Sequence, residues 1–183
     1  MMKSTLLTLV LAASLTIATY GQTARFTGSF TGDGTLVIAD GTHHIRIPDI
    51  SEPSDHCPTA PYVHSIQKRH GDYYVVVTIS HWTRGYPPRG GAGGSGEEAY
   101  IKWLHIVDGK ISESTEGLFR SWGDNRDGFI DGWHDSIFKV TTNDLLEDKL
   151  KAKEKDIWQD IIYTFDARHP ENGIKEEKGN PYE

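Results

Sequence analysis

Short runs of alternating apolar and polar residues cover most of the chain between residues 25 and 166. Side chains two residues apart lie on the same face of a strand, so this alternation favours β-strands over helices. Two runs, Tyr73–Trp82 and Ala99–Val107, are apolar at both phases of the alternation. Strands of this kind are buried on both faces. The pattern therefore predicts a sandwich or a barrel.

Turn signals that contain glycine separate these runs at short intervals. Asp40-Gly41, His70-Gly71 and Asp108-Gly109 each stand between two apolar runs, and such pairs readily adopt the positive φ of tight hairpin turns. The fold class predicted is mainly β, an antiparallel sandwich or barrel of roughly seven to nine strands with hairpin connections. The predicted strands are Arg25–Thr31, Thr35–Ala39, His43–Ile47, Tyr62–Arg69, Tyr73–Trp82, Ala99–Val107, Lys110–Phe119 and Ile157–Asp166.

One α-helix is expected at residues 142–154. Thr142 or Asn143 can cap its first turn, and Leu145, Leu146 and Leu150 form an apolar stripe. Several lysines follow near its end, where the helix dipole favours positive charge. The tail after Pro170 is polar and is expected to be loose.

The first residues differ from the rest of the chain. Lys3 precedes an apolar run from Leu6 to Ala18, and small residues follow up to Gly21. This order is typical of a secretory signal peptide, and the run is short for a membrane span, which needs roughly 20 apolar residues. The alternative is a short buried helix. We therefore expect residues 1–21 to be a signal peptide, residues 22–183 to form one β-rich domain, and the protein to be secreted or periplasmic.

Charge and cysteine content narrow the function classes. The formal net charge is −7, which disfavours binding to nucleic acid or to anionic membranes, because both depend on Lys and Arg. Cys57 is the single cysteine, so no internal disulfide can form. We expect Cys57 to be a buried apolar residue; a reactive thiol and a crosslink between chains are the alternatives.

The segment from Gly123 to Asp135 resembles part of the EF-hand and dockerin-type calcium loop. Calcium takes six to eight oxygen ligands, and the segment alternates acidic residues around Gly128, which matches the turn glycine of that loop. The resemblance fails at both ends, where Gly123 and His134 replace the expected carboxylates. The candidate calcium ligands are Asp124, Asn125, Asp127, the carbonyl of Phe129, Asp131 and Asp135.

An acidic, solvated turn held by Asp and Asn side chains explains the same residues without an ion. The sequence leaves these two interpretations open. If calcium binds, a stabilising role is expected, because the ion would neutralise clustered carboxylates.

Four of the nine histidines share a phase with apolar strand residues. If the four faces line one interior, three or four imidazoles could converge on zinc, iron or copper. The alternative is that each imidazole is satisfied separately inside the domain. The candidate ligands of this second metal site are His43, His64, His81 and His105.

Trp122 and Trp133 flank the acidic segment and are candidate ligand-binding residues for a glycan. Aromatic residues of an all-β domain are more often part of the core. Ser65-Ile66-Gln67-Lys68 matches the Ser-x-x-Lys motif, but that motif requires a helix, and a strand is predicted here. No catalytic residue is predicted from the motifs.

The leading hypothesis is therefore an exported, non-enzymatic domain, with calcium as the candidate stabilising ion, that binds a glycan or a protein partner. The alternative is a metal-dependent enzyme that uses the inward-facing histidines. A third possibility is an exported structural protein without an ion.

Overall fold

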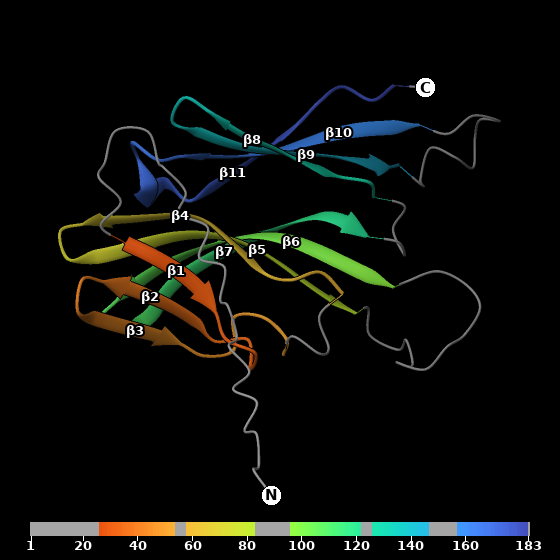
Figure 1. The fold of residues 1–183 in the computed structure, drawn as a ribbon. Helices are drawn as coiled ribbons and strands as arrows, with labels where there is room; N and C mark the ends of the chain where they lie inside the picture. The colour runs from red at the N-terminus through yellow and green to blue at the C-terminus, as the bar shows by residue number, and fades with distance from the viewer. Residues whose placement is uncertain (1–25, 54–57, 83–95, 122–125, 147–156, 183) are drawn as a thin grey trace, which may run out of the picture.

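The computed structural model describes residues 26–53, 58–82, 96–121, 126–146 and 157–182. In these residues the chain forms three antiparallel sheets (Figure 1), which confirms the predicted mainly β fold with sandwich-like packing. The N-terminal sheet contains β1 (Phe26–Phe30), β2 (Leu36–Asp40) and β3 (His43–Ile47). The middle sheet contains β4 (Tyr62–Arg69), β5 (Asp72–Trp82), β6 (Glu97–Val107) and β7 (Lys110–Ser121). The C-terminal sheet contains β8 (Phe129–His134), β9 (Ile137–Leu145), β10 (Trp158–Asp166) and β11 (Ile174–Lys178), and a 3-10 turn, η1 (Pro170–Asn172), precedes β11.

Each sheet is a meander, because its strands pair in sequence order. The predicted turns provide the connections: Asp108 and Gly109 have φ of 50° and 73°, and His70 and Gly71 have φ of 53° and 100°. Positive φ at both central residues is the type I′ arrangement, whose twist matches that of the flanking strands.

The middle sheet lies between the other two (Figure 1), and its two faces bury separate cores. Val75 and Val77 of β5 pack with residues of the N-terminal sheet such as Leu36 and Ile38. Val76, between them in sequence, packs on the other face with the C-terminal sheet. All three valines are fully buried. The two-sided burial predicted for Tyr73–Trp82 and Ala99–Val107 is therefore confirmed.

The helix expected at residues 142–154 is wrong where the structure describes it. Thr142–Leu145 is the end of β9 and pairs with Trp158–Ile161 of β10, whereas the pairing of β9 with β8 ends at Thr141. Thr142 is 1% exposed and lies opposite Ile161. In residues 142–145 the pairing with β10 supplies backbone hydrogen bonds in place of those of a helix, and it overrides the local capping signal. Residues 147–156 lie outside the described residues.

The residues after Pro170 are part of the C-terminal sheet, which corrects the expectation of a loose tail. Strand β11 pairs with β10, with Ile174 opposite Phe165. The indole Nε1 of Trp103 donates to the carbonyl of Pro170 at 2.9 Å. The sequence signal was weak because Ile174 is the single apolar residue of this edge strand.

Two expectations fall on residues outside the described ranges, namely the signal peptide of residues 1–21 and the buried Cys57. Among the described residues, the search for a helix long and apolar enough to cross a membrane finds none.

Candidate functional site

The acidic segment lies across β8 rather than in one compact loop. Asp127 precedes β8, Phe129 and Asp131 belong to it, and Asp135 stands in the turn after it with φ of 54°. At about 3.3 Å per residue the six residues of β8 span roughly 16 Å. Calcium ligands lie about 2.3–2.6 Å from the ion, so Asp127 and Asp135 cannot bind the same calcium ion. Asp124 and Asn125 lie outside the described residues.

Asp131 has protein partners. It is the extra residue of a bulge, since Ile130 pairs with Val140 and Gly132 with Lys139. The Asp131 carboxylate accepts a hydrogen bond from the Thr141 hydroxyl at 2.6 Å and lies 3.7 Å from the Lys139 ammonium. These contacts explain its position within the sheet without an ion. The calcium hypothesis therefore now depends on three of the six predicted ligands, Asp124, Asn125 and Asp127, which are neighbours in sequence.

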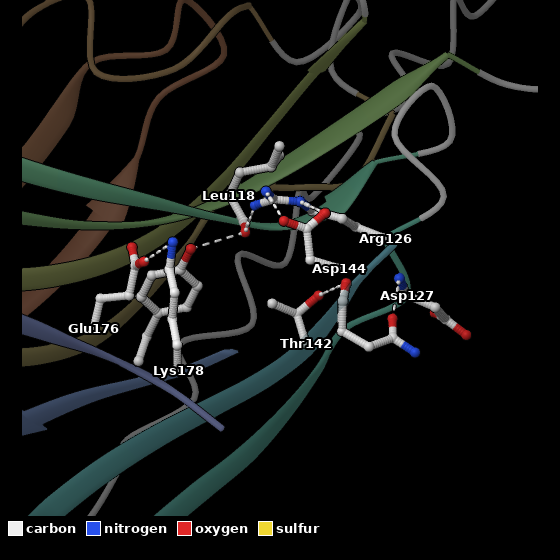
Figure 2. A network of polar contacts seen from close by, with 9 residues as sticks. Leu118, Arg126, Asp127, Thr142, Asp144, Glu176 and Lys178 are labelled. Atoms are coloured by element: carbon white, nitrogen blue, oxygen red, sulfur yellow. Dashed lines mark hydrogen bonds and ion pairs between the residues drawn. The ribbon is translucent and has the colours of Figure 1, made fainter. Parts of the chain in front are cut away.

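A polar network holds the start of this segment against the middle sheet (Figure 2). The Arg126 guanidinium binds both oxygens of Asp144 on β9, at 2.9 and 3.3 Å, and donates to the Leu118 carbonyl on β7 at 3.2 Å. The Tyr163 hydroxyl of β10 donates to the same carbonyl at 3.2 Å. The backbone N–H of Asp127 donates to Asn143 Oδ1 at 3.1 Å. Asp127 is therefore fixed beside the end of β9.

The structure does not bring the four candidate histidines together. His43 is exposed at the start of β3. The His64 ring contacts Phe138, which belongs to the core between the middle and C-terminal sheets. His81 stands two residues after Ile79 on β5 and shares its face, which is the face towards the N-terminal sheet. In the described residues no group of three or more His, Cys, Asp or Glu side chains is placed to hold a metal ion.

His105 and His81 instead form similar pairs at opposite ends of β5 and β6. His105 Nε2 lies 2.9 Å from Asp72 Oδ2, and its ring stacks on Tyr74 with centroids 4.7 Å apart. His81 Nε2 lies 3.3 Å from Glu98 Oε2, and its ring stacks on a tyrosine of β6, Tyr100, at 5.0 Å. In each pair the carboxylate and the aromatic ring fix the imidazole, which supports a structural role.

His64 has a third kind of environment. Its ring lies between Tyr62 and Phe138, with centroids 4.9 and 4.4 Å away, and its Nε2 is 3.0 Å from the Thr78 hydroxyl. Burial lowers the pKa of His64 from 6.5 to about 4, because the protonated ring would lose hydration that these neighbours do not replace. His64 is therefore neutral at physiological pH.

Trp133 belongs to the inner side of the C-terminal sheet. Its ring packs on Phe138 at 5.3 Å and on Phe165 at 6.4 Å, next to the core shared with the middle sheet. Trp122 lies outside the described residues. Trp133 therefore does not provide the exposed ring that the glycan hypothesis assigned to it.

Other aromatic side chains occupy the outer side of this sheet. Phe129, opposite Thr141, is 58% exposed, and Tyr182, which pairs with Trp158, is 44% exposed. Cross-strand partners share a face and successive residues alternate. Thr141 and Trp158 are out of phase with the buried residues of β9 and β10, so both rings lie on the side away from the core.

Polar side chains lie between these two rings. Asn143 and Asp160 are cross-strand partners on β9 and β10. The Tyr182 hydroxyl donates to Asp160 Oδ1 at 2.9 Å, and this hydrogen bond to the carboxylate raises the pKa of Tyr182. We define the outer aromatic face as Asp127, Phe129, Asn143, Trp158, Asp160, Ile162 and Tyr182. Sequence reasoning missed most of it, because the pairing of Tyr182 with Trp158 joins a predicted loose tail to a strand.

Comparisons with known protein families, with curated proteins and with solved structures give no match to this chain.

Proposed function

We propose that this protein is an exported, non-enzymatic recognition domain that binds its partner through the outer aromatic face. The observation that carries the proposal is the exposure of Phe129 and Tyr182 on one side of a single sheet, with Asn143 and Asp160 between them. Exposed apolar side chains that gather on one face, together with polar groups that fix orientation, are typical of interaction surfaces.

The distribution of exposed apolar residues supports this choice of surface. Five large hydrophobic residues are exposed in the described ranges, and Phe129, Ile130 and Tyr182 all belong to the C-terminal sheet or its bridge. Ile111 and Tyr62 stand apart on the middle sheet, on β7 and β4. Ile130 lies opposite the buried Val140 and is therefore on the other side of β8 from Phe129. Single exposed hydrophobic residues need no explanation, whereas Phe129 and Tyr182 lie on the same side of one sheet and indicate a contact surface.

The arrangement of the titratable groups favours recognition over catalysis. The imidazoles of His81 and His105 are each paired with a carboxylate and stacked on a tyrosine. A zinc-dependent enzyme needs three protein ligands around one ion. Of the candidate histidines, His43 is on the N-terminal sheet, and His81 lies on the opposite face of the middle sheet from His64 and His105. Export remains part of the proposal on the strength of the signal-like order of residues 1–21.

Chemical-shift mapping with isotope-labelled protein tests the proposal. Panels of neutral oligosaccharides and of short peptides would be titrated, and a true ligand should shift the amides of residues 127–131, 141–143, 158–162 and 182. Phe129→Ala should weaken that ligand, while Ile111→Ala, which removes an exposed apolar side chain from β7, should leave its affinity unchanged. Shifts confined to the His105–Asp72 end of the middle sheet would overturn the proposal.

A further inference from the structure

We infer that the outer aromatic face recognises a basic, lysine- or arginine-rich segment of a partner protein. This inference rests on the proposed function and names the chemistry of the ligand. It is carried by three features of the face: its excess of carboxylates, its shortage of hydrogen-bond donors and its exposed rings.

Carboxylates outnumber ammonium groups on this side of the sheet. Asp160 is out of phase with the buried residues of β10 and therefore faces the outer side. Glu177 lies opposite Ile162, and Lys175 and Lys139 lie on either side of Thr164; Ile162 and Thr164 also face the outer side. Two of the carboxylates on this side are already balanced, because Lys139 lies 3.7 Å from Asp131 and the Arg168 guanidinium binds both oxygens of Asp166. The remaining carboxylates are Asp127, Asp160 and Glu177, whereas the remaining strand lysine is Lys175. A cationic partner is complementary to this charge.

The hydrogen-bonding groups beside the rings also favour a ligand that only donates. Asp160 and Asp127 offer acceptor oxygens. The Tyr182 hydroxyl, a donor, is engaged with Asp160. Asn143 Oδ1 accepts from the Asp127 backbone, and the Asn143 side chain is also hydrogen-bonded to Tyr182. Lysine and arginine side chains donate and do not accept. Sugar hydroxyls do both, and a neutral glycan would find few donors here.

The exposed rings supply the third feature. A guanidinium or ammonium placed over an aromatic face gains about 0.5–1 kcal/mol at an exposed site. Phe129 and Tyr182 both carry exposed ring surface, and carboxylates flank both of them. Such a surface can hold the alkyl stem of a basic side chain against a ring while the charged head meets a carboxylate.

The test uses hexa-arginine and hexalysine peptides, with an uncharged glycine-serine peptide of equal length, titrated into the whole protein. Both basic peptides should shift the amides of the outer aromatic face, and their affinity should fall between about 50 mM and about 300 mM salt. Phe129→Leu keeps an apolar side chain but removes the ring, and it should weaken binding about two- to fivefold. Asp160→Asn should weaken binding to a similar extent.

Glu113→Gln is the matched control, because it removes one exposed carboxylate from β7 of the middle sheet. It should change the affinity less than twofold. Equal effects of Glu113→Gln and Asp160→Asn, or basic peptides that leave the face unshifted, would overturn the inference. If a neutral oligosaccharide shifts the same amides and loses affinity in Phe129→Ala, the proposed function stands and the inference about a basic partner fails.

Discussion

The ring of Tyr163 on β10 lies directly against the backbone of Gly117 on β7. A Cβ atom at Gly117 would stand 2.4 Å from Tyr163 Cε1 and 2.6 Å from its Cζ. The same tyrosine donates its hydroxyl to the Leu118 carbonyl, next to that glycine. The middle and C-terminal sheets therefore meet closely at this point because one strand carries no side chain there.

Gly117→Ala should destabilise the protein by about 1–3 kcal/mol, since the ring or the strand must move to admit the methyl group. Gly179→Ala is the control, because its Cβ would meet atoms no closer than 3.5 Å, and neither glycine has a positive φ. Urea unfolding followed by tryptophan fluorescence measures both variants. Equal stability of the two would contradict the close approach of Tyr163.

The Arg126–Asp144 pair should contribute more to stability than an exposed pair of the same sheet. The side chains of Arg126 and Asp144 are 19% and 25% exposed, against 57% and 44% for Lys178 and Glu176. Asp144→Asn leaves the guanidinium without its carboxylate and should cost about 1–2 kcal/mol, whereas Glu176→Gln should cost less than about 0.5 kcal/mol. Denaturant titration of both variants measures these losses of stability. A larger loss for Glu176→Gln than for Asp144→Asn would show that the contact between the C-terminal and middle sheets does not depend on the Arg126 network.

The fold was predictable where the signal is local. Asp108-Gly109 is a turn because those residue types accept positive φ, and the double apolar phase of β5 reports burial on both faces. Residues 142–146 misled because a capping threonine and the leucines Leu145 and Leu146 fit the start of a helix equally well. The pairing of the end of β9 with β10 decides for a strand, and that pairing depends on residues far apart in sequence.

The site was less predictable for the same reason. His64, His81 and His105 share a phase with apolar neighbours, but phase gives the face of one strand and not which sheet covers that face. Trp133 and Phe129 are both aromatic residues of β8, yet one packs inward on Phe138 and the other is 58% exposed. Regular alternation would place residues 129 and 133 on the same face. The bulge at Asp131 shifts the alternation within β8, and it could not be located from the sequence.

Acid should destabilise the protein through His64. Its pKa is about 4 in the folded state, below the ordinary value of 6.5, so the unfolded chain binds more protons between these values. The contribution of His64 is complete above about pH 6.5 and is lost as the pH falls towards 4, by at most about 3 kcal/mol. His64→Gln removes this titration and should reduce the loss of stability between those pH values, as measured by urea unfolding across the range. Identical pH profiles for the variant and the parent would show that His64 is not buried as a neutral ring.

Calcium should act through the start of the acidic segment if it binds there. The length of β8 separates Asp127 from Asp135, and Thr141 and Lys139 already contact Asp131, so an ion would depend on Asp124, Asn125 and Asp127. Elemental analysis should then find calcium near one per chain, and a chelator should lower the melting temperature until calcium is restored. Asp127→Ala should abolish the response to calcium, whereas Asp135→Ala should retain it. An unchanged melting temperature with chelator and with added calcium would show that the segment holds no stabilising calcium ion. Zinc or copper in the sample would instead support the histidine hypothesis.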